Sequence, residues 1–211
     1  MTDSKLTIAV PRGSLFKEAL DCLDRAGIDT TPVRENDRRL HFPEVGIVTV
    51  RPTDVPTYVD CGAADLGITG KDVIGEQLDR DFIELLDLEF GGCKMVVATI
   101  EIEPDPMVEA AKRLGVVRVA TKYPKAAAAW FASQGTQVEI VEVKGSVELA
   151  PLTGLADGIV DLVATGATLR ENGLIARAEI GSTTARLIAN PVAHRLKAAA
   201  IDDLAARISP A

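Results

Sequence analysis

The sequence is poor in the side chains that build metal centres and disulfide frameworks. It contains two histidines, His41 and His194, and three cysteines, Cys22, Cys61 and Cys93. The cysteines are odd in number and show no Cys-x-x-Cys pairing, which is typical of reduced thiols rather than of disulfides or a zinc site. With so few imidazoles, we expect no metal to be held by the protein's own side chains.

Long apolar runs and an excess of basic residues are also missing. No stretch approaches the roughly 18 uncharged apolar residues of a membrane span. The apolar run near the N-terminus has about five residues, short of the roughly 7 to 15 of a signal peptide. We therefore expect a cytoplasmic protein that does not contact membranes. Lys and Arg total 23 against 31 Asp and Glu, a net charge of −8, which does not indicate a nucleic-acid-binding face.

Short β-rich runs alternate with segments of helical periodicity along the chain. Its 211 residues suffice for one large domain or two small ones, and the alternation is typical of sheets covered by helices on both faces. The expected strands are 5–10, 44–50, 64–70, 82–88, 93–100, 117–121, 138–143, 158–164, and a long passage over 174–191 interrupted by Gly181. The expected helices are 15–26, 53–62 with Thr53 as N-cap, 71–78, 105–114, 124–135, one starting at Ser146, 167–172 and 192–208. Residues 34–39 are expected to form a charged loop.

The apolar runs 82–88 and 93–100 follow one another with only Gly91-Gly92 as a break and no helix between them. This pattern predicts a crossover from one lobe to another. We expect a first lobe of residues 1–90 plus 179–211 and a second lobe of residues 91–178. The fold class is α/β, with two lobes of mixed, mainly parallel sheets joined by crossing strands. Because ligands of such sheets bind beyond the carboxyl ends of strands, we expect the site in the cleft between the lobes.

An apolar run that ends on a lone acid is the most distinctive local feature. Residues 158–164 predict a buried strand carrying Asp161, and Thr165-Gly166-Ala167-Thr168 follows before a helical pattern resumes. A small-residue turn at a helix start lets backbone N–H groups face a phosphate while threonine hydroxyls add donors. An ordinary strand-to-helix turn capped by threonine is the alternative, and this stretch alone leaves both open.

Two common nucleotide-binding motifs are absent. Gly67 and Gly70 are three positions apart and Asp72 follows Lys71, so the spacing of a P-loop fails, and no Gly-x-Gly-x-x-Gly occurs. Basic residues gather instead at expected strand ends, where an anionic substrate would need local cations. These are Arg12, Arg51, Lys71, Lys122 and Lys144.

The stretch VDLVATGATL resembles the phosphoribosyl-binding turn of type I phosphoribosyltransferases. In those enzymes two acids at a strand end hold ribose hydroxyls, and a small-residue loop receives the 5-phosphate. This chain has Asp161 as the first acid but Leu162 at the second position, a departure from the type I pattern.

Four stretches together resemble the ATP phosphoribosyltransferase family over nearly the full length of the chain. They are RPTDVPTYVDCGAADLGITGKDVI, ATKYPKAAAAWFASQG, KGSVELAPLTGLADGIVDLVATGATLRENGL and AEIGSTTARLIANP. One departure is PRGSL, where the family commonly shows Pro-Lys-Gly-Arg. Arg12 keeps the first charge, and Ser14 lacks the second.

The resemblance implies transfer of the 5-phosphoribosyl group of 5-phosphoribosyl 1-pyrophosphate (PRPP) to N1 of ATP. Pyrophosphate is released, and the reaction is the first step of histidine biosynthesis. The implied PRPP-binding residues are Asp161, Ala164, Thr165, Gly166, Ala167 and Thr168. The residues implied at ATP or pyrophosphate are Arg12, Arg51, Lys94 and Glu148. Asp161, Arg12 and Arg51 are the catalytic candidates, and Mg²⁺ is expected to be carried by the substrate phosphates.

The resemblance is to the short form of the family, which lacks a C-terminal histidine-binding domain. This form implies a homodimer within a hetero-oligomer that contains a histidyl-tRNA-synthetase-like regulatory subunit. The two-lobe pattern and ADLGITG also resemble type II periplasmic solute-binding proteins. An intracellular ligand-binding module and a type I-like base phosphoribosyltransferase are therefore the alternative functions.

Overall fold

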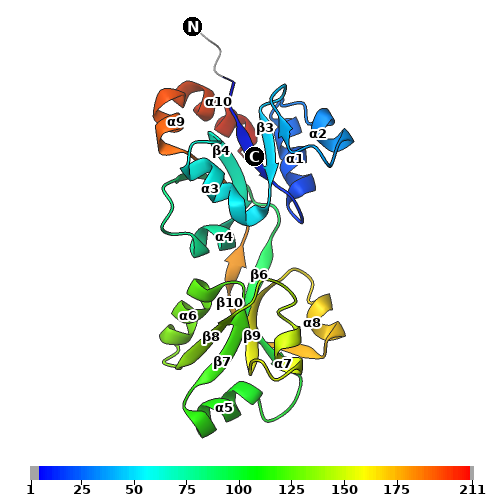
Figure 1. Cartoon of the computed structure of the whole chain (residues 1–211), viewed down its shortest axis with the longest axis vertical. Helices are drawn as coiled ribbons and strands as arrows, with labels where there is room; N and C mark the ends of the chain where they lie inside the picture. The colour runs from blue at the N-terminus through cyan, green and yellow to red at the C-terminus, as the bar shows by residue number, and fades with distance from the viewer. Residues whose placement is uncertain (1–4, 210–211) are drawn as a thin grey trace. The chain divides into compact units, whose positions relative to one another are not determined.

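The computed structural model describes residues 5–209, which form two compact units (Figure 1). Unit 1 contains the described residues up to Gly92 and those from Thr184 onward, and unit 2 is Cys93–Thr183. The sequence placed the boundaries two and five residues earlier, after 90 and after 178. The second boundary lies later because the last strand of unit 2 continues to Thr183, which is in register with Cys93.

Unit 1 contains a six-stranded sheet in the order β2-β3-β1-β4-β11-β5. Its strands are β1 (Ile8–Pro11), β2 (His41–Phe42), β3 (Ile47–Val50), β4 (Leu66–Gly70), β5 (Ile83–Asp87) and β11 (Ala185–Ala189). The block β3-β1-β4 is parallel, whereas β2, β11 and β5 pair antiparallel with their neighbours. Every residue of β1 and β4 is buried, as expected of strands covered on both faces.

Helices cover both faces of the unit 1 sheet. They are α1 (Phe16–Arg25), α2 (Thr31–Glu35), the 3₁₀ turn η1 (Pro52–Asp54), α3 (Val55–Asp60), α4 (Lys71–Glu76), α9 (Pro191–Leu196) and α10 (Ala198–Ile208). The alternation of side chains along β1 shows the two cores. Ile8 packs in a cluster with Leu20 of α1 and Leu204 of α10, whereas Ala9 packs in the opposite cluster with Val55 of α3.

Unit 2 contains a five-stranded sheet in the order β10-β6-β9-β7-β8. Its strands are β6 (Cys93–Ile100), β7 (Val117–Thr121), β8 (Val138–Glu142), β9 (Gly158–Val163) and β10 (Leu174–Thr183), and its helices are α5 (Pro106–Leu114), α6 (Pro124–Ser133), α7 (Leu149–Leu152) and α8 (Ala167–Glu171). Strands β9, β7 and β8 are parallel, and β6 and β10 are antiparallel. Figure 1 shows α6 on one side of this sheet and α7 and α8 on the other.

The sheets are more evenly mixed than the sequence suggested. Parallel pairing is confined to β3-β1-β4 and to β9-β7-β8. The strands that carry the chain between the units, β6, β10 and β11, add antiparallel pairs, because they run in the opposite direction to the strands beside them. The description "mainly parallel" is therefore wrong, while the α/β class with mixed sheets is confirmed.

Two segments differ from expectation in the extent or the start of a helix. Residues 34–39 were expected to be a loop, but α2 extends to Glu35. Arg34 is held there by hydrogen bonds to Thr30 and by ion pairs of 2.7 Å with Asp21 and Asp24. Thr53 is not an N-cap, since it lies inside η1 and α3 begins at Val55.

Three further expectations about element ends were wrong. The single helix 192–208 is two helices that break at Lys197, whose ammonium group holds both carboxylate oxygens of Asp65 at 2.8 and 2.9 Å. Ser146 does not start a helix, because its φ is positive at 46° and α7 begins at Leu149. The long β passage divides at Thr184, while Gly181 lies within β10 beside a register shift.

Among residues 5–209, no helix is long and apolar enough to cross a membrane. The N-terminal stretch that was too short for a signal peptide begins with Met1 to Ser4, which lie outside the described residues.

The close approach of α3 to β4 gives a test of the unit 1 core. A Cβ atom on Gly67 would lie 2.6 Å from Cγ1 of Val55 and 2.8 Å from Cγ2 of Val59. Gly67→Ala is expected to lower the free energy of unfolding by about 1–3 kcal/mol, or roughly 2–4 °C of Tm per kcal/mol, through overpacking. Urea and thermal unfolding measure this change.

Gly75 in α4 is the matched control, because nothing lies within 4 Å of a Cβ atom built there. Gly75→Ala should leave stability unchanged or raise it by about 0.5–1 kcal/mol through its better helix propensity. Equal stability of the two variants would contradict this packing of α3 on β4.

Candidate functional site

Asp161 lies in β9, three residues before the small-residue turn begins. It is buried, with 7% of its surface exposed, and its Oδ1 atom accepts a hydrogen bond of 2.9 Å from the backbone N–H of Leu162. Strand β9 runs between β6 and β7, so the carboxylate is fixed by a central strand rather than by a loop. Desolvation raises the pKa of Asp161 above its usual value, while nearby Lys122 and the Leu162 N–H group act to lower it.

Two charged side chains from neighbouring segments act on Asp161. Lys122 follows β7 directly, and its positive charge favours the ionised carboxylate. Glu148 stands at the N-cap position of α7, and its negative charge raises the pKa of Asp161 further. The structure thus brings together two predicted residues, Asp161 and Glu148, and adds a cation to them.

The turn after β9 presents small side chains to solvent. Its exposed residues are Ala164, Thr165, Ala167 and Thr168. Gly166 is the N-cap residue of α8 and has a φ of 74°, in the left-handed region that favours glycine. A Cβ atom at Gly166 would also lie 2.9 Å from Nη1 of Arg170. The backbone conformation therefore favours glycine here, whereas the guanidinium of Arg170 is the flexible end of a side chain and can move aside for a Cβ atom.

Side chains within the same turn and helix hold this backbone in place. The N–H group of Ala167 donates to Oγ1 of Thr165 at 3.4 Å, and Nη1 of Arg170 donates to the carbonyl of Thr165 at 3.1 Å. Nδ2 of Asn172 donates to the carbonyl of Thr168 at 2.9 Å. The first N–H groups of a helix have no partner inside the helix, so N–H groups, hydroxyls and the guanidinium of Arg170 are together able to bind an anion.

Lys94 lies on β6, where its backbone is in register with Val163 at the end of β9. Its ammonium group forms an ion pair of 2.7 Å with Glu179 of β10, and both side chains are about half exposed or more. Lys94 is thus close to the turn in the sheet register, while its charge is shared with Glu179.

Arg12 and Arg51 lie on unit 1 and directly follow two neighbouring parallel strands. Pro11 ends β1 and Val50 ends β3, and these two residues are in register. Both arginines line one cavity of about 570 Å³, together with Leu40, His41, Val48, Thr49, Val50, Asp54, Tyr58 and Ala63. The structure therefore places the two cations at the same end of two neighbouring parallel strands.

The two arginines differ in how firmly they are held. Nε of Arg12 donates to Oγ1 of buried Thr49 at 3.0 Å, one Nη atom donates to the carbonyl of Arg39 at 2.9 Å, and the guanidinium lies 5.6 Å from the ring centre of Phe16. Arg51 is exposed, and within residues 5–209 no hydrogen bond or ion pair engages its guanidinium. Arg12 is preorganised, whereas Arg51 is free to reach a ligand.

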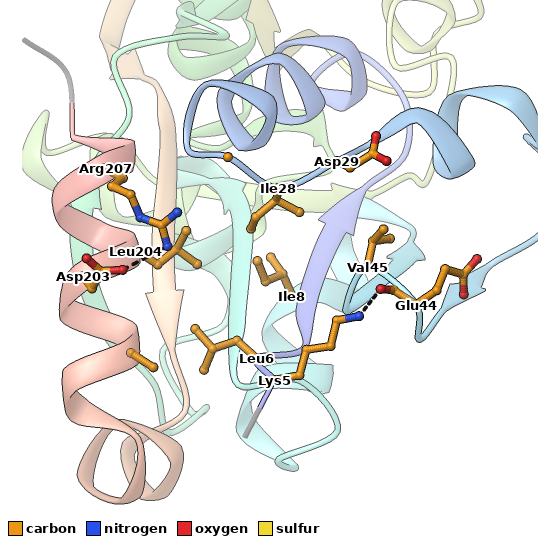
Figure 2. A pocket seen from close by; sticks show the side chains of 12 residues that line it. Lys5, Leu6, Ile8, Ile28, Asp29, Glu44, Val45, Asp203, Leu204 and Arg207 are labelled. Carbon is orange, nitrogen blue, oxygen red and sulfur yellow. Dashed lines mark hydrogen bonds and ion pairs between the residues drawn. The ribbon is translucent and has the colours of Figure 1, made fainter. Parts of the chain in front are cut away.

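A second cavity of unit 1, of about 750 Å³, contains none of the predicted residues (Figure 2). Its floor is apolar and includes Ile8 and Leu204. The charged groups at its rim have partners in the protein: Lys5 donates to the carbonyl of Glu44, and Arg207 pairs with Asp203 at 3.0 Å. Because its charges are satisfied internally, this cavity is not the candidate site.

Two cations of unit 2 were not assigned to the site from the sequence. The sequence predicts Lys122 only at a strand end and Arg170 only within the helix ATLREN. Only their positions in the sequence could have indicated a role, because Lys122 directly follows β7 and Arg170 lies one turn into α8. The contacts that give them a role join β7 to β9, or α8 to the turn before it.

Comparison with known proteins gives consistent matches. The family model described as HisG: ATP phosphoribosyltransferase matches residues 51–210. The ATP phosphoribosyltransferase of Bacillus licheniformis is 47% identical over 209 residues, which cover 97% of this chain and 94% of that protein. The ATP phosphoribosyltransferase of a Geobacillus species is 48% identical over 210 residues, which cover 97% of each.

Solved structures agree on the fold. The ATP phosphoribosyl transferase (HisG:HisZ) complex from Thermotoga maritima matches with a TM-score of 0.80 and 33% identity, over 96% of this chain and 95% of that chain. The periplasmic aliphatic sulphonate binding protein SsuA from Escherichia coli matches with a TM-score of 0.59 at 18% identity, over 96% of this chain and 70% of that one. The second likeness confirms the periplasmic-binding-protein-like fold and says nothing of ligand. The family model, the curated relatives and the first structure agree: the chain belongs to the ATP phosphoribosyltransferase family.

Proposed function

We propose that the turn after β9 holds PRPP while the phosphoribosyl group passes to N1 of ATP, with release of pyrophosphate, in the first step of histidine biosynthesis. The single observation that carries this proposal is a buried carboxylate, Asp161, followed by an exposed glycine-threonine turn at the start of α8. A carboxylate suits sugar hydroxyls, and N–H groups at a helix start suit a phosphate.

The reaction needs no nucleophilic side chain. N1 of adenine carries no proton and attacks C1 of PRPP directly, so the bond from N1 to C1 forms as the bond from C1 to the pyrophosphate oxygen breaks. The protein contributes by holding the two substrates in line and by stabilising charge. This requirement fits a site made of a carboxylate, guanidinium groups and backbone donors.

Asp161 is assigned to the ribose hydroxyls and to the positive charge that develops at C1. Burial strengthens an electrostatic contact because little water remains to screen it. The same burial disfavours the free carboxylate, and Lys122 and the N–H group of Leu162 oppose that effect. The side chain is therefore poised for a partner that brings hydroxyls or positive charge.

The 5-phosphate is assigned to the turn from Ala164 to Thr168. Arg170 adds a positive charge beside this turn, since its guanidinium donates to the carbonyl of Thr165. On a chain with a net charge of −8, such local cations are needed to hold a polyanionic substrate.

Arg12 and Arg51 are assigned to the triphosphate of ATP or to pyrophosphate. Guanidinium groups bind phosphate oxygens with two parallel hydrogen bonds, and both arginines line the same cavity of unit 1. Lys94 and Glu148 are assigned to the same substrates, with Lys94 exchanging its ion pair with Glu179 for a phosphate.

Mg²⁺ is proposed to reach the site on the phosphate oxygens of the substrates. Carboxylate oxygens are among the ligands that Mg²⁺ prefers, and the negative charge of Glu148 acts on the buried carboxylate of Asp161. These residues fit the edge of a metal–pyrophosphate complex. When bound, the metal would neutralise charge on the leaving pyrophosphate.

The proposal extends to assembly and place in the cell. The Thermotoga maritima structure is a HisG:HisZ complex, and this chain covers 95% of the chain that it matches there. We assign to this chain a dimer that binds a HisZ-like regulatory subunit in the cytoplasm, with the response to histidine residing mainly in that partner. Co-purification with the partner, followed by assays with and without histidine, tests this assignment.

The direct test of the proposed function is to mix the protein with ATP, PRPP and Mg²⁺ and to follow the absorbance of N1-substituted adenine. Asp161→Ala and Thr168→Ala should each lower kcat/KM for PRPP by about 100-fold or more, on the scale of a lost preorganised contact. Thr153→Ala is the control, because its exposed hydroxyl bonds only to the carbonyls of α7. Near-normal PRPP use by the first two variants would refute the assignment.

Asp161→Asn gives a second test that separates stability from catalysis. The raised pKa of Asp161 means that the folded state loses stability as pH rises through that pKa, because the buried carboxylate becomes charged. Asn removes this charge and can still accept the N–H bond of Leu162.

The Asn variant should therefore have a higher Tm than the unchanged protein at pH 7.5, with the difference shrinking as pH falls toward the usual carboxyl pKa of 3.8. Its kcat/KM for PRPP should nevertheless fall by about 100-fold, as for Asp161→Ala. Thermal unfolding at several pH values measures the first effect, and a lower Tm at pH 7.5 would show that the charge of Asp161 is well stabilised in the protein without substrate.

Arg51→Ala tests the assignment of the unit 1 cavity. It should raise the KM for ATP about tenfold, the loss expected for one hydrogen bond to a charged group of about 1.5 kcal/mol, and leave the KM for PRPP less affected. Arg195→Ala removes an exposed arginine of α9 and serves as the control. An equal effect of the two changes on ATP use would argue against this role for Arg51.

A further inference from the structure

Thr121 ends β7 with a fully buried hydroxyl group that makes two hydrogen bonds. Oγ1 donates to the carbonyl of Val160 at 2.7 Å and accepts from the backbone N–H of Tyr123 at 2.9 Å. The first bond joins β7 to β9, and the second joins the end of β7 to the N-cap residue of α6. One side chain therefore ties together three elements of unit 2.

The residues that Thr121 joins are those that precede the charged pair of the candidate site. Thr121 and Val160 are in register across the parallel strands β7 and β9. Lys122 follows Thr121 and Asp161 follows Val160 in sequence, and Lys122 is the cation that acts on Asp161. The hydroxyl thus adds a bond, beyond the strand pairing, between the two backbones at the point where these side chains leave the sheet.

The chemistry of the position favours a hydroxyl over an apolar side chain of the same shape. Valine would fill the same volume but would leave the carbonyl of Val160 and the N–H group of Tyr123 without this partner in a buried environment. An unpaired buried group favours a shift of the chain until it finds another partner or water. Such a shift at the end of β9 would move Asp161.

We propose that Thr121 is a positioning residue that sets the place of Asp161 and Lys122 for PRPP. This inference rests on the proposed role of Asp161 and adds a residue that itself touches no substrate. Misplacement of a reacting group by about 1 Å can lower a rate by roughly 100-fold, so a single hydroxyl in this place has a measurable effect.

The test compares Thr121→Val with Thr121→Ser in the full-length protein. Thr121→Val should lower kcat/KM for PRPP by about 10- to 100-fold while the KM for ATP changes little. Thr121→Ser keeps the hydroxyl and should recover most of the loss, which a role in packing alone would not produce. Failure of serine to recover PRPP use, in a variant that melts as a folded protein, would overturn the proposal.

Thr99→Val is the matched control. Thr99 is also fully buried in the unit 2 sheet, and its hydroxyl donates to the carbonyl of Ile100 at 3.2 Å and accepts from Nε of Arg177 at 2.9 Å. Loss of the Thr99 hydroxyl should lower the free energy of unfolding without a selective effect on kcat/KM for PRPP. If Thr99→Val and Thr121→Val lowered kcat/KM for PRPP equally, the effect would be one of general stability and the proposal would be wrong.

A double-substitution cycle separates this inference from the proposed function. If Thr121 acts through Asp161, Thr121→Val should lower kcat/KM for PRPP by less than about twofold in an Asp161→Asn background, because the effects of coupled residues are not additive. Near-normal PRPP use by Asp161→Asn alone would refute the proposed function. A large loss in Asp161→Asn with no loss in Thr121→Val, or a full loss in both backgrounds, would refute only the positioning role.

Discussion

A negative charge held away from water near the end of β9 is the constraint on which the candidate site depends. Desolvation disfavours the charged form of Asp161, and Glu148 adds a like charge nearby. The groups that oppose these effects are a backbone N–H bond from Leu162 and the charge of Lys122. The balance leaves a carboxylate that is costly to keep charged without a ligand, which is the state in which a substrate with hydroxyls and developing positive charge gains most.

Much of the fold could be predicted because its elements are marked locally. Strand 93–100 was expected at the bounds that β6 has, and 117–121 at those of β7, since each is an apolar run bounded by clear turn residues. The errors arose where side chains distant in sequence decide the outcome. Lys197 breaks the last helical segment because it reaches Asp65, a contact 132 residues away in the chain. No local pattern of residues 192–208 contains that information.

The candidate site likewise has features that local sequence predicts and features that depend on residues distant in the chain. The placement of Arg12 and Arg51 at one sheet edge followed from strand ends, because parallel neighbours end at the same edge. The surroundings of Asp161 did not follow, since Lys122 and Glu148 act on it from other segments. Thr121 bonds to the carbonyl of the preceding residue, Val160, and the pairing of β7 with β9 spans about 40 residues. Sequence reasoning proposed which residues carry the chemistry, and the structure shows which residues surround them.

The turn proposed to hold the phosphate differs from Asp161 in that the hydrogen bonds that shape it are local. The contacts that shape the turn join Thr165, Ala167, Thr168, Arg170 and Asn172 to one another. The hydrogen bonds of this segment involve no residue from elsewhere in the described chain, although Leu169 of α8 packs into the unit 2 core. The hydrogen bonds of the turn would therefore be retained on another strand-turn-helix unit, whereas the surroundings of Asp161 would have to be rebuilt in each new sheet.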